Sequence, residues 1–143
     1  MISMSSEYAL KALVFLTRLP DQGPATAQRI ASEMGIPRKY LSRILRELVT
    51  AEVLTASPGR AGGFRLNRDP RTLRLAEVVE PFEQFLGARS GCPFDNKSCD
   101  GTDPCAGHRK WSELRTRLQT FLKETSIQEI AIHASDSNGK SRH

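Results

Sequence analysis

The stretch that decides the fold spans residues 26–50 and reads TAQRIASEMGIPRKYLSRILRELVT. Thr26 is typical of a helix N-cap and Gly35 of a helix end, so the sequence predicts one helix between these two residues. Pro37 suits the first turn of a second helix, which we expect to end at about Thr50. Two helices joined by a short glycine turn are typical of a helix-turn-helix motif.

The second helix of this motif has two chemically different faces. One face is aliphatic at positions i, i+3, i+4 and i+7 and is expected to be buried. Its residues are Leu41, Ile44, Leu45 and Leu48. The opposite face is rich in Lys, Ser and Arg, which contact phosphates and base edges in the DNA major groove. An ordinary amphipathic surface helix is the alternative interpretation. The candidate DNA contacts in this helix are Arg38, Lys39, Tyr40, Ser42, Arg43 and Arg46.

A turn-rich hairpin is predicted directly after the helix-turn-helix. Residues 52–56 and 63–66 have the composition of two short strands, and the segment SPGRAG lies between them. Glycines at the tip allow a close approach to a backbone, Arg60 supplies charge there, and Arg65 is a further candidate DNA contact in the second strand. A basic hairpin in this place is a wing. We therefore expect a mainly α-helical fold with a small β-hairpin, a winged helix-turn-helix.

The positive charge of the chain is concentrated around these two motifs. The chain has 143 residues and a formal net charge of +5, and residues 37–68 carry the whole excess, with seven Lys or Arg against two Glu. A solvated charged face is the ordinary explanation of a basic cluster, but this concentration favours a polyanionic partner, double-stranded DNA. The chain shows no signal-peptide pattern and no apolar run of the ~20 residues that a bilayer requires. We expect a cytoplasmic protein with no membrane partner.

The rest of the chain is predicted to add helices and one long loop. A helix over residues 7–19 precedes the motif, a short helix over 75–86 is expected to kink or end near Pro81, and a longer helix over 108–124 follows. The Ser126-x-x-Glu129 capping box predicts a further short helix. The predicted units are 1–70 (winged helix-turn-helix), 71–86 (connecting helix), 87–108 (cysteine-rich cluster-binding loop), 109–132 (dimerisation helices) and 133–143 (disordered tail).

The long helix after the loop carries a stripe of mostly apolar residues that recur every three or four positions. The stripe consists of Trp111, Leu114, Leu118, Phe121, Leu122 and Thr125. Such a stripe can be ordinary core. It also suits a dimerisation element, because palindromic DNA sites are bound by two-fold symmetric proteins. We therefore expect a long C-terminal dimerisation helix and a homodimer.

All three cysteines fall in one hydrophilic loop, at Cys92, Cys99 and Cys105. An odd number in a chain without an export signal argues against a disulfide framework, and the loop offers little core for a buried thiol, so metal ligation is the better interpretation. Gaps of six and five residues are wider than in most structural zinc sites and favour an iron–sulfur cluster. The fourth ligand must be another group. His108, separated from Cys105 by two residues, is the local candidate, and Glu7 is the distant one.

Other uses of these residues stay open. The same winged helix could hold zinc at its cysteines or use them as a thiol redox switch. The chain could instead be a small electron-transfer iron–sulfur protein, although the helix-turn-helix and wing argue against this. Catalysis has the least support, because no Ser/His/Asp or Cys/His/Asn arrangement and no phosphate-binding glycine loop is recognisable. We expect the chain not to be an enzyme.

Several motifs together resemble the IscR/NsrR-type (Rrf-two) family of winged-helix transcriptional regulators. They are Tyr8-Ala9-Leu10, Ile30-Ala31 through Gly35-Ile36-Pro37-x-x-Tyr40-Leu41, Gly59-x-x-Gly62-Gly63-Phe64-x-Leu66, Leu75-Ala76-Glu77-Val78-Val79, and the three-cysteine loop with His108-x-x-Trp111. The resemblance covers about residues 1–132. It implies a homodimer, crossed over at the long C-terminal helix, that binds a roughly palindromic promoter site. It further implies a regulator, with repression the expected mode, that is switched by an iron–sulfur cluster responding to redox state, nitric oxide or iron–sulfur status.

The resemblance also bears on the cluster and on the target site. The pattern Cys-Cys-Cys-x-x-His is similar to the branch that holds a 2Fe-2S cluster, which we favour over a 4Fe-4S cluster. The first gap has six residues, however, where that branch typically has five. Another branch takes an acidic residue of its first helix as fourth ligand, and Glu7 occupies about that position. Pro37, Lys39 and Ser42 depart from the IscR pattern, so the target DNA sequence does not carry over.

Overall fold

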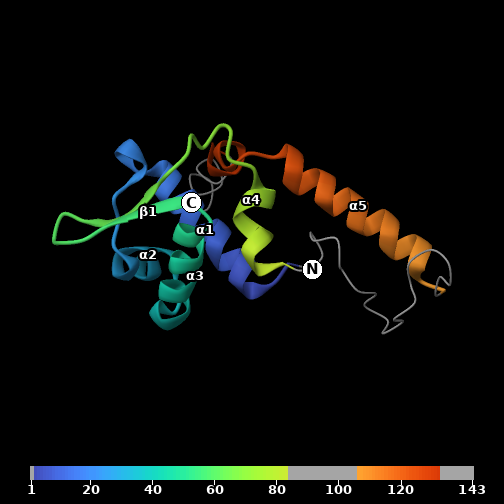
Figure 1. The fold of residues 1–143 in the computed structure, drawn as a ribbon, viewed down its shortest axis with the longest axis horizontal. Helices are drawn as coiled ribbons and strands as arrows, with labels where there is room; N and C mark the ends of the chain where they lie inside the picture. Colours follow the sequence, from blue (N-terminus) through green and yellow to red (C-terminus); the bar gives the residue numbers. More distant parts are fainter. Residues whose placement is uncertain (1, 84–105, 133–143) are drawn as a thin grey trace, which may run out of the picture.

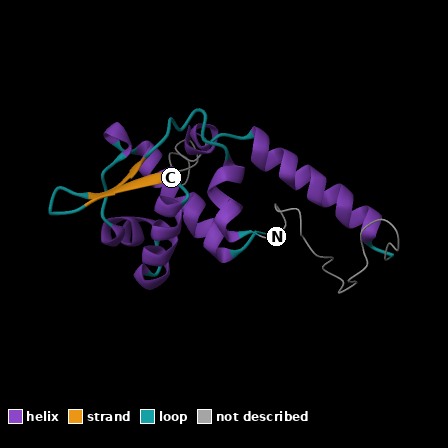
Figure 2. Ribbon diagram, viewed as in Figure 1, coloured by secondary structure: helices purple, strands orange, loops and turns teal. Residues whose placement is uncertain are grey.

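The structure, a computed structural model, describes residues 2–83 and 106–132 (Figure 1). Within these ranges it is mainly helical with one small antiparallel hairpin, which confirms the predicted fold class (Figure 2). The elements are α1 (Met4–Arg18), the 3₁₀ turn η1 (Pro20–Gln22), α2 (Ala27–Met34), α3 (Arg38–Thr50), β1 (Leu54–Ser57), β2 (Gly63–Leu66), α4 (Leu75–Val79), the 3₁₀ turn η2 (Glu80–Phe82) and α5 (His108–Glu124). Residues 127–132 are also helical.

Helices α2 and α3 form the predicted helix-turn-helix. The Thr26 hydroxyl accepts a hydrogen bond from the Arg29 backbone N–H at 3.1 Å, and Gly35 ends α2 in the left-handed conformation with a φ of 65°. Both predicted caps are confirmed, whereas Pro37 occupies the N-cap position of α3, just before the first turn that the sequence predicts for it. The predicted aliphatic face of α3 is buried against α1 and α2. It consists of Leu41, Ile44, Leu45 and Leu48.

Helix α1 begins earlier than the sequence predicts, at Met4 rather than at Glu7. The Ser3 hydroxyl caps it by accepting a hydrogen bond from the Ser6 backbone N–H at 3.2 Å. Serine is a favoured N-cap because its oxygen satisfies an N–H group that has no partner within the helix. Apolar periodicity marks only the buried part of a helix, so it did not reveal this first turn.

The predicted wing is a two-stranded hairpin in which Leu54 lies opposite Leu66. Its first strand begins two residues later than the sequence predicts. Glu52 has a left-handed φ of 62°, and Val53 donates its backbone N–H to the Leu48 carbonyl at 3.0 Å, so these two residues still form the turn that ends α3. Extended pairing starts only after this turn.

The base of the wing is joined to the segment between α1 and α2. Ala25 and Phe64 exchange two backbone hydrogen bonds, of 3.0 and 2.8 Å. Gly63, next to this bridge, has a φ of 139°, and a Cβ there would lie 2.5 Å from the Ala25 carbonyl oxygen. Only glycine permits such an approach in this conformation. The direction of the wing is therefore set at its base.

The connecting helix ends near Pro81, which confirms one of the two outcomes that the sequence predicts there. Helix α4 ends at Val79, and the chain continues as the 3₁₀ turn that contains Pro81, because a proline ring cannot be accommodated inside a continuous α-helix. Glu83 follows this turn, and its carboxylate accepts hydrogen bonds from the Ser3 backbone N–H and, at 2.7 Å, from the Ser6 hydroxyl. The chain that leads towards the cysteines is thus attached to the start of α1.

Helix α5 is attached to the rest of the described chain at its C-terminal end. Three backbone N–H groups donate across this junction: Leu75 to the Thr125 carbonyl, Ile127 to the Leu73 carbonyl and Gln128 to the Pro70 carbonyl. The predicted capping box is confirmed, because Ser126 N–H donates to the Glu129 carboxylate at 2.8 Å and Glu129 N–H donates to the Ser126 hydroxyl at 3.2 Å. From this junction, α5 extends so that its N-terminal end lies away from α1–α3 (Figure 1).

Glu77 of α4 is held by two neighbours. Its carboxylate accepts a hydrogen bond from the Arg74 backbone N–H at 2.9 Å and pairs with the Arg68 guanidinium. Partial burial raises the pKa of the Glu77 carboxyl, but these hydrogen bonds and the nearby positive charges outweigh it and bring the pKa below its ordinary value. The carboxylate therefore stabilises the fold above the ordinary pKa of Glu, and this contribution is lost as the pH falls through the lower, folded-state pKa.

We expect Glu77→Gln to lower the free energy of unfolding at pH 7 by about 1 kcal/mol, because the partly exposed ion pair with Arg68 and the helix cap are weakened together. Urea unfolding at pH 7 and at about pH 3 measures the effect, and the difference from wild type should shrink at the acidic pH. Glu33→Gln, at an exposed position of α2, is the control. An undiminished difference at acidic pH would contradict the charge-based explanation.

Some predictions concern residues outside the described ranges. These include Cys92, Cys99 and Cys105 and the tail over residues 133–143. The boundaries of the predicted units remain predictions. Among the helices of residues 2–83 and 106–132, none is long and apolar enough to cross a membrane.

Candidate nucleic-acid interface

The outer face of α3 presents most of the predicted DNA contacts to solvent. Ser42 is half-buried, and the other candidates on this helix are exposed. The exposed candidates are Arg38, Lys39, Tyr40, Arg43 and Arg46. Tyr40 has 58% of its surface exposed, which is high for a large aromatic residue. None of the ion pairs between described residues involves the four cations of this face, so their charge is not neutralised within the described chain.

The tip of the wing is tightly turned and carries one cation. Gly59 has a φ of 94°, and a Cβ on Gly62 would lie 2.1 Å from the Ser57 carbonyl oxygen, so glycine is needed at both positions. Arg60 lies between these glycines and is exposed. The hairpin extends past α2, and its strand β1 packs against α3 (Figure 1). The predicted contacts of α3 and Arg60 are thus carried by two neighbouring elements.

Two arginines of the basic region are bonded to other parts of the protein. The Arg65 guanidinium donates a hydrogen bond to the Asp21 backbone carbonyl at 2.7 Å, and Arg68 pairs with Glu77. The partners lie 44 and 9 residues away in the sequence, so the local pattern carried no signal of either contact. That Arg65 contacts DNA remains a prediction.

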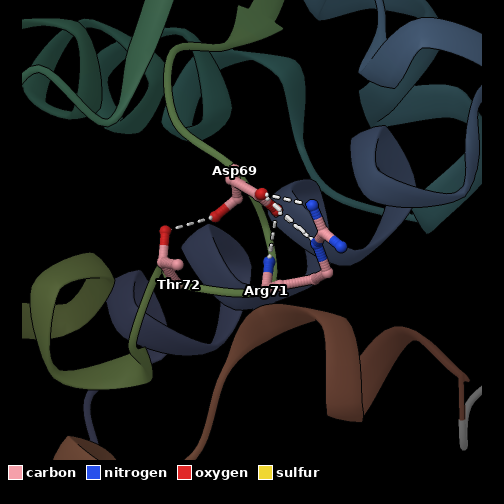
Figure 3. A network of polar contacts seen from close by, with 3 residues as sticks. All are labelled: Asp69, Arg71 and Thr72. Carbon is pink, nitrogen blue, oxygen red and sulfur yellow. Dashed lines mark hydrogen bonds and ion pairs between the residues drawn. The ribbon is translucent and has the colours of Figure 1, made fainter.

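A polar network shapes the loop between the wing and α4 (Figure 3). The Arg71 guanidinium donates to both carboxylate oxygens of Asp69, and the Thr72 hydroxyl donates to the Asp69 carbonyl at 3.1 Å. The Arg71 side chain and its backbone N–H lower the pKa of the Asp69 carboxyl, and Asp69 in turn raises the pKa of Arg71. Both side chains are exposed, so the pair adds little stability. Its main effect is to neutralise the charge of Arg71 locally.

The candidate cluster ligands are only partly within the described residues. His108 is the first residue of α5 and is half-buried, with its Nε2 atom 3.5 Å from the Ser112 hydroxyl. Glu7 is exposed in the first turn of α1. The N-terminal end of α5 and helix α1 lie apart in the fold, so the described chain does not bring Glu7 and His108 together (Figure 1). Residues 2–83 and 106–132 contain no group of three or more His, Cys, Asp or Glu that could hold a metal.

Helix α5 presents an apolar face that the described chain covers only in part. Leu122 is buried with 2% exposure, whereas Leu114 and Phe121 remain 47% and 51% exposed. An apolar groove of about 320 Å³ is lined on one side by Leu118, Phe121 and Leu122 of α5, and its lining includes Leu10 and Val14 of α1. The sequence predicts the apolar stripe of α5 but not the part that α1 plays in the groove. The groove-lining residues of α1 have the same helical spacing as residues of an ordinary core, so the pattern does not distinguish them.

Comparisons with known proteins agree with this architecture. A family model described as Rrf2, iron-dependent transcriptional regulator, matches residues 2–133. A protein of Aquifex aeolicus, provisionally described as an HTH-type transcriptional regulator, is 31% identical over 124 residues, covering 86% of this chain and 85% of the relative. The HTH-type transcriptional regulator IscR of Xenorhabdus nematophila is 26% identical over 129 residues, covering 90% of this chain and 77% of the relative.

A solved structure extends the agreement to the fold. CymR of B. subtilis, described as its global cysteine regulator, aligns with a TM-score of 0.75 at 20% identity, covering 93% of this chain and 97% of that chain. The relatives are transcriptional regulators, and the family model spans the winged helix-turn-helix together with α4 and α5. The chain therefore belongs to the Rrf2 family of transcriptional regulators.

Proposed function

We propose that two copies of this chain bind a roughly palindromic promoter site in double-stranded DNA, and that an iron–sulfur cluster switches their affinity for it. The observation that carries the DNA-binding part is the outer face of α3, whose four cations are exposed and form no ion pair with described residues. Lys and Arg in a groove-reading helix supply phosphate and base-edge contacts, and Arg60 adds a cation at the wing tip.

The second copy is the partner that best fits the apolar groove along α5. Phe121 lines the groove, and Leu114, seven positions earlier, lies on the same face of α5. An identical copy related by a two-fold axis would bring matching apolar side chains to each groove. Burial of these side chains removes apolar surface from water on both protomers. A two-fold dimer also places two α3 helices for two half-sites, which a monomer does not.

The donor set of the cysteine loop fits an iron–sulfur cluster. Cys92, Cys99 and Cys105 provide three thiolates, the ligands that such clusters prefer, and His108 follows in the same segment as the proposed fourth ligand. Glu7 of a partner protomer is the alternative fourth ligand. When bound, the cluster would supply a group that responds to oxidants, nitric oxide or iron–sulfur supply. The 2Fe-2S form is proposed and the 4Fe-4S form is its alternative.

Two described contacts connect the cysteine-bearing segment with the DNA-reading part. Before the segment, Glu83 is hydrogen-bonded to the start of α1, and α1 packs directly on α3. After the segment, the chain enters α5, whose far end is joined to residues 70–75, which lie between the wing and the start of α4. A change in the ligation of the cysteines would therefore act through α1 and α5 on the distance between the two α3 helices of the proposed dimer. Cluster binding raises the affinity for DNA if the cluster-bound state is the better DNA binder, and lowers it if the cluster-free state is.

Protein purified without oxygen is expected to contain iron and acid-labile sulfide in equal amounts, about two of each per chain for a 2Fe-2S cluster. Visible absorption and metal analysis measure this result. Cys99→Ser should lose most of the iron because it removes a thiolate, whereas Thr120→Ala, which removes an exposed hydroxyl of α5 about three turns away from His108, should retain it. Zinc without sulfide would favour the zinc site, and absence of any metal would favour the thiol switch.

Two further variants in the same assay distinguish the two candidates for the fourth ligand. His108→Ala is expected to lose or alter the cluster spectrum while Glu7→Gln retains it, and the reverse result would assign the ligand to Glu7. Salt-sensitive, sequence-specific DNA binding by the loaded protein would exclude the electron-transfer alternative.

A further inference from the structure

Arg65 stands on the outer face of strand β2. Side chains alternate along a strand, and its neighbours Phe64 and Leu66 pack towards the core, so Arg65 projects from the opposite side of the hairpin. Although exposed, its guanidinium donates a hydrogen bond of 2.7 Å to the backbone carbonyl of Asp21. This contact joins the strand to a turn 44 residues earlier in the chain.

The turn that accepts this hydrogen bond has an unusual backbone and lies close to β2. Asp21 and Gln22 both have left-handed φ values, of 61° and 55°, which residues other than glycine rarely adopt. Gly23 follows with a φ of 122°, and a Cβ there would lie 2.8 Å from the Phe64 carbonyl oxygen. The turn is thus in close contact with the strand, and the Asp21 carbonyl lies within hydrogen-bonding distance of the Arg65 side chain.

Three hydrogen bonds therefore hold the base of the wing to the segment between α1 and α2. Two are the backbone pair of Ala25 and Phe64, and the third is that of Arg65. The hairpin beyond this base has only two strands, and a two-stranded hairpin has little stability of its own. The placement of Arg60 relative to α3 consequently depends on how firmly the base is held.

We propose that Arg65 is a positioning residue for DNA binding. It holds the wing at the angle that brings Arg60 to the DNA backbone and makes no phosphate contact itself, and this role replaces the direct DNA contact that the sequence predicts for Arg65. This inference rests on the proposed DNA-binding function. The proposal gives Arg60 and Arg65, which carry the same charge, different roles in one hairpin. Loss of a phosphate contact changes how DNA affinity depends on salt, whereas loss of a positioning contact does not.

The test compares Arg65→Gln with Arg60→Gln, because both variants remove one positive charge from the wing. The probes are a duplex selected by the wild-type protein from a random-sequence library and a scrambled duplex of the same length. Binding is measured over a range of salt concentrations, well below the unfolding temperature of each variant. A phosphate contact contributes about 0.9 to the slope of log affinity against log salt.

Arg60→Gln is expected to lower that slope by about 0.9 for each protomer and to weaken binding to both duplexes. Arg65→Gln is expected to leave the slope at the wild-type value and to weaken binding to the selected duplex about tenfold, with little change for the scrambled one. In the free protein, amide exchange of Ala25 and Phe64 should accelerate in Arg65→Gln and stay unchanged in Arg60→Gln, because only Arg65 belongs to the base.

Four results would overturn the inference. An equal fall in slope for both variants would make Arg65 a phosphate contact. Wild-type affinity and slope in Arg65→Gln, together with a lower unfolding temperature, would reduce Arg65 to a purely structural residue. Absence of DNA binding by the wild-type protein would overturn the proposed function and the positioning role with it, whereas unchanged amide exchange in Arg65→Gln would overturn only the role at the wing base.

Discussion

Replacing Arg43 and Arg46 together by alanine is expected to weaken binding to the selected DNA site about 1000-fold. The proposed homodimer would lose four guanidinium groups from its two α3 helices, and a groove or phosphate contact of this kind contributes at least about 1 kcal/mol. The fold should be unaffected, because both side chains are exposed and the buried face of α3 is untouched. Fluorescence anisotropy with a labelled duplex measures the loss.

The control for this variant removes the same amount of charge elsewhere. Lys11→Ala with Lys123→Ala deletes two exposed cations outside α3 and the wing, and it should bind nearly as well as wild type. Normal binding by the Arg43→Ala, Arg46→Ala protein would show that α3 does not enter the groove. An equal loss in the control would mean that only the overall charge matters.

Phe121→Glu is expected to raise the dissociation constant of the homodimer at least about 100-fold. An aromatic side chain at the centre of an interface commonly contributes more than about 2 kcal/mol, and the variant also buries a charge if the dimer forms. Phe121 is about half exposed in the single chain, so the monomer can accommodate the glutamate at its surface. Sedimentation velocity over a concentration series measures the effect, and binding to the selected DNA site should fall in parallel.

Thr116→Glu introduces the same charge on the same helix but away from the apolar stripe, and it should remain dimeric. Leu114→Glu lies on the face of Phe121 and should repeat its behaviour. A dimeric Phe121→Glu protein would place the interface elsewhere and leave the groove to another partner.

The elements that follow one strong local rule were predictable from the sequence. The α3 face was predicted from its i, i+3, i+4, i+7 pattern, and the ends of α2 from Thr26 and Gly35. The errors occurred where the backbone conformation depends on contacts. The left-handed conformation of Glu52 makes the first strand begin later than the sequence predicts. The N-cap Ser3 lies outside the apolar repeat, so the start of α1 was predicted too late.

The candidate site was predictable to a similar extent. The exposure of Arg43 and Arg46 follows directly from the helical pattern, because positions opposite a buried stripe face solvent. The attachment of Arg65 to Asp21 joins distant parts of the chain, so it could not be predicted from spacing. The three-dimensional arrangement of the cysteines lies outside the described residues.

The junction between residues 70–75 and 125–128 is built from backbone hydrogen bonds. Main-chain groups are the same in every sequence, so two relatives with the same chain path can form this junction even when their side chains differ. Recombination near residue 74 could therefore exchange DNA-reading parts between relatives while α5, the helix proposed to join two protomers, stays docked, provided that the apolar residues around it still pack. Such a hybrid would combine the target sequence of one regulator with the signal of another, which offers a route by which new regulatory circuits arise and can be engineered.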